Sequence, residues 1–249
     1  MKKSVYDNDG FFELYQKLRN NPLSLNEVVE KPTMLSLLPD LTEKTLLDMG
    51  CGTGEHLQLY LQRKAKFVVG IDLSQSMLQQ AKINLTKHNE KQPHFALHHL
   101  AMEHIDELAD EFDVITSSFA FHYIEDFPKL LRKIYHKLKP DGEMIFSQEH
   151  PIVTCYKQGD RWQKNEHKQQ IAYRLNYYRE EGERDRSWFK QPFKTYHRTI
   201  ATIFNDLIAT GFKIEKVVEP MLAEQAELHN EFKDLQHRPV LLFVKVRKC

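Results

Sequence analysis

The chain has 249 residues with 35 Lys plus Arg and 35 Asp plus Glu, so its formal net charge is zero. A chain of this length buries a large core without disulfides or structural metals. A neutral chain has no overall field that would favour nucleic acid or an anionic membrane as a partner.

Cysteine and apolar patterns limit the protein class further. The three cysteines have no C-x-x-C spacing and the thirteen histidines no H-E-x-x-H spacing, so we expect neither a disulfide scaffold nor a metal site. Polar residues follow Met1 where a signal peptide needs an apolar stretch, and no apolar run of about 18 residues occurs. We therefore expect a cytoplasmic protein with no membrane segment.

The first elements are helical. Helical periodicity over residues 10–19 and 25–37 predicts a helical cap before residue 45. Tyr15 and Arg19 lie four residues apart and share one face of the first helix. Arg19 lies either over a ligand or in solvent, because surface arginines are common.

From residue 45 onward, strand-like and helical patterns alternate, which predicts a parallel sheet with crossover helices. Asp126 is the expected N-cap of one helix and Gly211 ends the last one. The turn Lys139–Gly142 separates a helix from a strand. The expected strands are 45–48, 66–71, 94–99, 112–117, 142–148, 212–219 and 240–246. The expected helices are 54–64, 75–89, 127–138 and 199–210, with a short turn near 103–109.

A glycine-rich turn follows the first expected strand. Gly50, Gly52 and Gly54 separate Asp48 from the next helix, and glycine allows positive φ and a close approach to bare backbone. About 20 residues later a second strand ends at Asp72, as in nucleotide sites where an acid binds the ribose hydroxyls. A dinucleotide fingerprint is disfavoured because Glu55 replaces its third glycine. Asp48 would repel a pyrophosphate and attract an ammonium or sulfonium group.

The segments Leu47–Gly54 and Gly70–Ser74 closely resemble motifs I and II of the class I S-adenosylmethionine-dependent methyltransferases. The resemblance covers nearly the whole chain. It implies an α/β fold with a Rossmann-like, doubly wound seven-stranded sheet in the order 3-2-1-4-5-7-6, with the last strand antiparallel. It also implies one domain over residues 1–249, with S-adenosyl-L-methionine as the cofactor. Its parts are a helical cap (1–44), a cofactor-binding core (45–150), a substrate lid (151–197) and a C-terminal helix and strand pair (198–249).

The implied cofactor site contains one departure from the family. Family members place an Asp beside the adenine amino group after the third strand, where this chain has Ala101. The Met102 backbone N–H would then recognise adenine, with affinity lower by about 0.5–1.5 kcal/mol. Tyr15 and Arg19 would cover the cofactor's amino-acid end. The implied cofactor residues are Tyr15, Arg19, Asp48, Gly50, Cys51, Gly52, Gly54, Asp72, Leu73, Ala101, Met102, Glu103 and Ser117.

Two further segments resemble family motifs that face the transferred methyl group. The first, Asp113–Tyr123, places His122 in the loop after the fourth strand, either as a base or as a packed residue. The second, Lys139–Pro151, ends its strand at Glu149 and His150. The predicted catalytic residues are therefore His122, Glu149 and His150, and a base is needed only if the acceptor carries a proton.

The segment from 151 to 200 has 11 Lys plus Arg, 6 Asp plus Glu and nine aromatic residues. This composition favours a lid over a small, anionic and flat or apolar acceptor, in which Arg184 or Arg198 would bind a carboxylate. Alternatively, its aromatics form a core of their own. The predicted substrate residues are Tyr123, Tyr178, Arg184, Trp188, His197 and Arg198. The functional alternatives are a non-catalytic protein that binds the cofactor or its product and, less favoured, a nicotinamide-dependent oxidoreductase.

Overall fold

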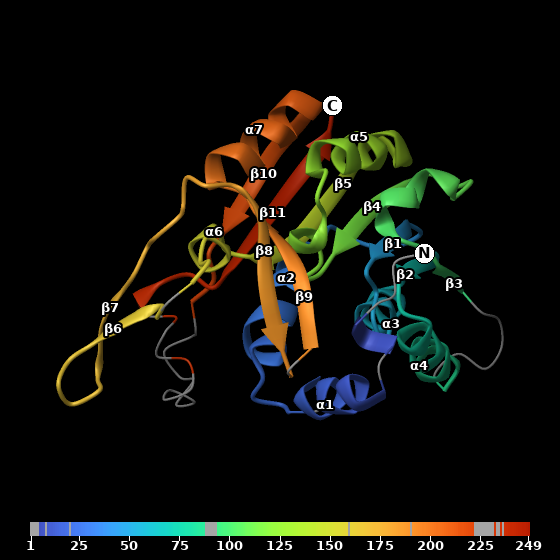
Figure 1. Cartoon of the computed structure of the whole chain (residues 1–249). Helices are drawn as coiled ribbons and strands as arrows, with labels where there is room; N and C mark the ends of the chain where they lie inside the picture. The colour runs from blue at the N-terminus through green and yellow to red at the C-terminus, as the bar shows by residue number, and fades with distance from the viewer. Residues whose placement is uncertain are drawn as a thin grey trace.

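The computed structural model describes residues 5–7, 9–19, 21–87, 94–158, 160–189, 191–221, 232, 235 and 237–249. Its centre is a seven-stranded sheet in the order β10-β11-β5-β4-β1-β2-β3 (Figure 1). β11 runs antiparallel to both β5 and β10, while the other pairs are parallel. The predicted order and the antiparallel last strand are confirmed. The strands are β1 Thr45–Met49, β2 Phe67–Asp72, β3 Phe95–His99, β4 Phe112–Ser117, β5 Leu138–Glu149, β10 Phe212–Val218 and β11 Leu241–Lys248.

Helices cover both faces of the sheet. Consecutive strand residues point to opposite faces, so the neighbours Leu46 and Leu47 of β1 belong to two separate apolar clusters. One cluster joins the sheet to α5 (Phe127–Lys137) and α7 (Ile200–Thr210). The other joins it to α2 (Lys31–Leu37), α3 (Glu55–Gln62) and α4 (Gln75–Thr86). Burial of both sheet faces explains why these strands are nearly continuous apolar runs.

The predicted helix boundaries are confirmed where a cap was identified. The Asp126 side chain accepts a hydrogen bond from the Lys129 N–H at the start of α5. Gly211 follows α7 with φ of 103°, the left-handed conformation of a C′ glycine. The expected turn near 103–109 is the short helix η3 (Met102–Glu107). The last residues of the expected helix 75–89 lie outside the described residues.

The predicted turn Lys139–Gly142 is part of a strand. β5 already begins at Leu138, opposite Phe112, and Glu143 is opposite Val114. Between these two paired positions β5 has four residues and β4 only one, so the four residues of β5 form a bulge. Gly142 is required there, because a Cβ atom would lie 2.8 Å from the Lys139 carbonyl oxygen. The turn signal was correct locally, but the sheet continues through it.

The cap and the insertion contain several short elements. The cap consists of η1 (Val5–Asp7), α1 (Asp9–Arg19), a π-helical segment η2 (Asn26–Glu30) and α2. The insertion forms α6 (Pro151–Thr154) and two hairpins, β6 (Trp162–Lys164) with β7 (Gln170–Tyr173) and β8 (Gly182–Trp188) with β9 (Gln191–His197). The β6–β7 hairpin projects away from the sheet (Figure 1). None of the described helices is long and apolar enough to cross a membrane.

Candidate functional site

A cavity of about 1360 Å³ lies at the carboxyl ends of the central strands. Its walls come from the glycine-rich turn, the ends of β2 and β5, the cap and the β8–β9 hairpin. Open α/β sheets bind ligands at this edge. The volume exceeds that of a typical pocket for one small molecule, about 300–1,000 Å³, and offers room for two ligands side by side.

The glycine-rich turn presents backbone to the cavity. Gly50 and Gly52 have φ of 77° and 53°, values that side-chain-bearing residues rarely adopt. The Gly50 and Cys51 amides both donate to the Ile71 carbonyl, at 2.8 and 3.0 Å. The turn is therefore held against the end of β2. A Cβ on Gly50 would lie 3.0 Å from the Ala120 Cβ, so the close approach also requires glycine.

Asp72 is locked at the end of β2 by two backbone donors. Its Oδ2 accepts from the Gly52 N–H at 2.9 Å and its Oδ1 accepts from the Ser74 N–H at 2.8 Å. Burial raises the pKa of Asp72 above its ordinary value, although these donors act in the opposite direction. Each carboxylate oxygen keeps a further lone pair for a ligand hydroxyl.

Asp48 is the next-to-last residue of β1 and is almost fully buried. The Thr116 hydroxyl donates to its Oδ1 at 2.9 Å. Burial raises the pKa of Asp48 to about 6, while neighbouring His56 lowers it. A buried carboxylate that ionises this reluctantly is a favourable partner for a positively charged ligand.

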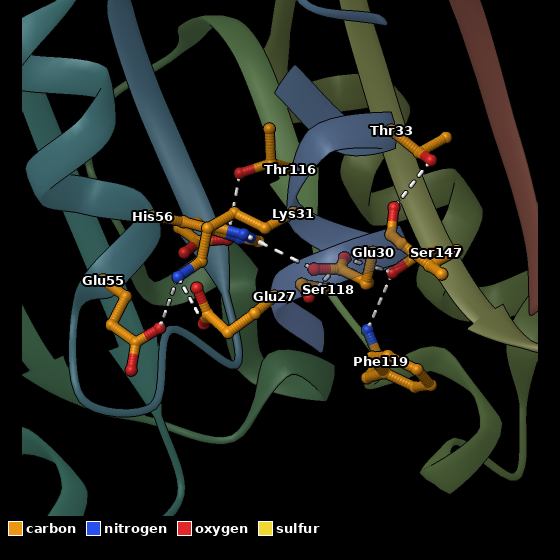
Figure 2. A network of polar contacts seen from close by, with 12 residues as sticks. Glu27, Glu30, Lys31, Thr33, Glu55, His56, Thr116, Ser118, Phe119 and Ser147 are labelled. Atoms are coloured by element: carbon orange, nitrogen blue, oxygen red, sulfur yellow. Dashed lines mark hydrogen bonds and ion pairs between the residues drawn. The ribbon is translucent and has the colours of Figure 1, made fainter. Parts of the chain in front are cut away.

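A polar network connects the cap to this edge of the sheet (Figure 2). Glu30 is 1% exposed, and its Oε1 accepts from the hydroxyls of Ser118 and Ser147 at 2.6 and 2.8 Å. Its Oε2 lies 3.5 Å from the His56 Nε2. The Phe119 N–H donates to the Ser147 hydroxyl at 3.1 Å, which fixes the loop after β4. The cap residue Glu30 is therefore part of the interior.

A second set of charges lies near the surface of the same region. Glu55, the first residue of α3, pairs with Arg19 at 2.8 Å and with Lys31 at 3.2 Å. Burial raises the pKa of Glu55, but the two cations outweigh burial and hold it below its usual value. Lys31 also pairs with Glu27 (Figure 2). Arg19 lines the cavity and is held there by Glu55.

The far end of the cavity contains His122 and Glu149. His122 lies on η4 (Phe121–Tyr123), is 5% exposed, and contacts Tyr123 with the two rings tilted and their centroids 4.3 Å apart. Burial lowers the pKa of His122, and nearby Glu149 opposes that shift. The Glu149 Oε2 lies 3.3 Å from the Arg186 Nη2. A neutral imidazole, a carboxylate and a guanidinium therefore share one wall.

The β8–β9 hairpin covers this end of the cavity, and most of the lining residues described here lie on one of its faces. Antiparallel partners share a face, and the pairs Arg186–Phe193 and Trp188–Gln191 all line the cavity. Thr195 lies further along the same face and is 1% exposed. The Phe193 ring lies 6.0 Å from the Tyr123 ring, between centroids. The hairpin thus contributes aromatic and polar side chains together.

The structure brings together most of the residues predicted from the sequence. Those that line the cavity are Arg19, Asp48, Gly50, Cys51, Gly52, Asp72, Leu73, Ala101, Met102, Glu103, His122, Tyr123, Glu149 and Trp188. The side chain of Tyr15 lies outside the described residues. Gly54 begins α3 and packs on Ala81, and the Ser117 hydroxyl donates to the Met49 carbonyl within the sheet.

Two predicted arginines have structural positions instead of ligand positions. Arg184 is 2% exposed and donates to the carbonyls of Cys155 and Glu183, among others. Arg198 donates to the carbonyls of Ile124 and Glu125 and lies over the Phe127 ring. Neither residue lines the cavity. We therefore leave both out of the candidate site, because neither lines the cavity and both hold backbone carbonyls.

The remaining predicted residues outside the cavity are satisfied by protein partners. The His150 Nε2 donates to Glu219 at 2.9 Å and its Nδ1 accepts from the Ile152 N–H. The His197 Nε2 donates to the Tyr178 carbonyl, so its Nδ1 accepts from the Thr154 hydroxyl at 2.7 Å. The Tyr178 hydroxyl accepts from the Ile200 N–H. His150, Tyr178 and His197 also leave the candidate site.

Sequence reasoning missed Glu30, His56, Arg186, Phe193 and Thr195. The sequence did contain information on the hairpin residues, because the alternation of a strand places Arg184, Arg186 and Trp188 on one face. Choosing between the two arginines required the position of the hairpin relative to the sheet. Glu30 had no signal, because an acid in an amphipathic helix normally faces solvent.

Comparison with known proteins supports one family. Residues 47–146 match the family model described as a methyltransferase domain. A Listeria monocytogenes structure described as an S-adenosylmethionine-dependent methyltransferase is 34% identical to this chain, with a TM-score of 0.80. The match covers 88% of this chain and 96% of that one. A Mesorhizobium loti structure of the same description is 29% identical, with a TM-score of 0.78, and covers 90% and 100%.

Two kinds of curated relatives also match. A Haemophilus influenzae protein described as uncharacterised is 65% identical over 248 residues, 99% of this chain and 98% of its own. A demethylmenaquinone methyltransferase of Lactococcus lactis is 34% identical over 48% of each chain. This chain spans only about a quarter to just over half of the length of the curated relatives with named activities.

Proposed function

Because the chain belongs to the S-adenosylmethionine-dependent methyltransferases, we propose that it methylates a small molecule held between the sheet edge and the β8–β9 hairpin. The observation that carries this proposal is that one continuous cavity is lined by both groups of residues. The glycine-rich turn, Asp48 and Asp72 line one part, and His122, Glu149 and the hairpin residues line another. A cofactor bound in the first part would therefore directly face an acceptor bound in the second part.

The first part of the cavity fits the cofactor. Asp72 has acceptor capacity left for ribose hydroxyls, and the exposed backbone of Gly50 and Gly52 leaves space where a side chain would intrude. Asp48 offers a buried carboxylate to a cation. Met102 follows β3 at the place where adenine would lie, and Ala101 lacks the family's carboxylate. When bound, S-adenosylmethionine supplies an electrophilic methyl group on a positively charged sulfur.

The second part of the cavity suits a methyl acceptor. The hairpin rings and η4 exclude water, and alignment of two bound reactants supplies much of the rate enhancement in such transfers. The lowered pKa of His122 keeps its imidazole neutral near pH 7, so it can accept a proton from the acceptor. The named relatives act on different acceptors, among them demethylmenaquinone and juvenile hormone acid. The shared core therefore does not specify the acceptor.

Two measurements test the proposal. Calorimetry should detect binding of S-adenosylmethionine and S-adenosylhomocysteine, and tight binding of NADH without either would reject it. Label from methyl-labelled S-adenosylmethionine should then enter a small-molecule fraction of a cell extract. Binding of the cofactor with no transfer to any fraction would instead favour a non-catalytic binding protein. Label in tRNA or protein alone would contradict the enclosed acceptor site.

We further propose a cytoplasmic location and no nucleic-acid substrate. Cys51, Cys155 and Cys249 are all free thiols, which suits a reducing compartment. The zero net charge supports a small acceptor over a polyanion. Fractionation of cells and the label test above check these two statements.

A further inference from the structure

Two buried polar atoms at the far end of the cavity lack a protein partner. The His122 Nδ1 and the Thr195 Oγ1 accept or donate no hydrogen bond to any described residue. Their side chains are 5% and 1% exposed, and both residues line the cavity. They lie on η4 and β9, which pack against each other. Because buried polar atoms are nearly always paired, these two atoms indicate the position of a ligand.

Arg186 lies on the same wall with donors to spare. Its Nη2 donates to Glu149 and to the Val153 carbonyl, at 3.3 and 3.2 Å. Among the described residues nothing accepts from its Nε or Nη1. These contacts fix the guanidinium plane, and a guanidinium binds a carboxylate through two parallel N–H donors.

The charges and rings around Arg186 limit the ligand further. Glu149 neutralises one cation, but Arg161 also lines the cavity and stacks on the Tyr156 ring. A bound carboxylate would thus meet a net positive wall. Tyr123, Trp188 and Phe193 line the same region with three aromatic rings. Rings favour a flat aromatic ligand through offset or edge contacts.

We propose that Arg186, His122 and Thr195 bind a flat aromatic carboxylate that carries a hydroxyl or amino group as the methyl acceptor. Arg186 holds the carboxylate, and Thr195 and His122 hydrogen-bond the acceptor group. This inference rests on the proposed function. It names the class of substrate. It also assigns substrate binding to Arg186 and Thr195, in place of Arg184 and Arg198.

The proposed reaction is a direct transfer of the methyl group from sulfur to the acceptor. The acceptor oxygen or nitrogen forms a bond to the methyl carbon while the sulfur–methyl bond breaks. The electron pair of the broken bond stays on sulfur. The acceptor's proton passes to the His122 Nδ1, to which no described residue is hydrogen-bonded. His122 then returns the proton to water. The products are the methylated acceptor and S-adenosylhomocysteine.

Binding measurements on the S-adenosylhomocysteine complex test the proposal. The probes are meta- and para-hydroxybenzoate and meta-aminobenzoate, each compared with its uncharged benzamide. At least one carboxylate should bind more tightly than its amide. Arg186→Gln should weaken that binding by about tenfold or more and remove the preference over the amide. Arg179→Gln, at an exposed arginine outside the cavity wall, is the matched control and should change nothing.

Thr195→Val separates a ligand role from a structural one. No described residue bonds the Thr195 hydroxyl, so this nearly isosteric change should leave the melting temperature unchanged or raise it. It should nevertheless weaken binding of the hydroxybenzoate several-fold. The control is Thr86→Val, where both hydroxyl contacts are to carbonyls of α4.

Three outcomes would overturn the inference. The first is that no carboxylate probe binds the complex. The second is that Arg186→Gln keeps the preference over the amide, and the third is that Thr195→Val leaves affinity unchanged. Each assumes that the wild-type protein first binds S-adenosylhomocysteine. Loss of that binding would contradict the proposed function itself, so the two failures are distinguishable.

Discussion

The Gly52 N–H donates to the Asp72 carboxylate at 2.9 Å, across twenty residues of sequence. This contact joins the glycine-rich turn to the acid that ends the next strand. Together with the Ser74 N–H, it fixes both oxygens of Asp72 before any ligand is present. The backbone thus preorganises the predicted cofactor site. Asp72 both holds the glycine-rich turn in place and is expected to bind the cofactor.

The first prediction concerns that side chain. Asp72→Ala should weaken S-adenosylmethionine binding by about 1.5–3 kcal/mol, because a charged hydrogen-bond partner is lost. Calorimetry measures the change. Asp110→Ala, at an exposed acid outside the cavity, should bind as wild type does. Equal affinity of the Asp72 variant and wild type would show that the ribose is held elsewhere.

The second prediction addresses the departure at Ala101. Ala101→Asp should tighten S-adenosylhomocysteine binding by about 0.5–1.5 kcal/mol, since a carboxylate would reach the adenine amino group. Ala101 precedes η3 and lines the cavity, so an Asp there is compatible with the backbone as an N-cap. Ala101→Leu is the control that adds bulk without an acceptor. Unchanged affinity of the Asp variant would place adenine away from Ala101.

The third prediction follows from the pKa of about 6 at Asp48, against 3.8 for an exposed aspartate. Because the folded value is raised, the unfolded state ionises first as the pH rises from about 4 to 6. The free energy of unfolding then decreases. Asp48→Asn cannot ionise and keeps an acceptor for Thr116, so it should gain on the order of 2–3 kcal/mol relative to wild type between pH 4 and pH 7.

Urea denaturation of the ligand-free protein at several pH values measures this difference. Asp110→Asn should follow wild type at every pH. A constant difference between Asp48→Asn and wild type would mean that Asp48 ionises normally. Cationic ligands should favour the ionised form, so cofactor binding near pH 6 should release protons, which calorimetry in two buffers detects.

The fourth prediction separates two interpretations of Arg198, as a ligand-binding residue or as a structural one. Arg198 holds two carbonyls and covers the Phe127 ring. Arg198→Ala should therefore lower the melting temperature without any ligand, because buried carbonyls lose their donors. The affinity for S-adenosylhomocysteine in the folded protein should stay within about 0.5 kcal/mol of wild type. Normal stability combined with loss of methyl transfer would return Arg198 to the acceptor site.

The sheet could be predicted in detail because its signals are local. Each signal spans only a few residues, as in the glycine-rich turn at Gly50, the strand that ends at Asp72 and the helix cap at Asp126. The bulge in β5 could not be predicted, since a turn signal says nothing about the strand that pairs across it. The substrate wall also depended on packing. Arg184 and Arg186 share one face and one chemistry, and only the position of the hairpin distinguishes them.

The buried position of Glu30 affects where this protein can be divided. The matched family region begins at residue 47, which suggests a boundary just after the cap. A chain started there would leave Ser118 and Ser147 without their shared acceptor. It would also uncover the apolar surface that Val29, Met34 and Leu37 cover. Expression of the core alone should therefore yield an aggregation-prone fragment, and fusion or tagging designs should keep the first 44 residues attached.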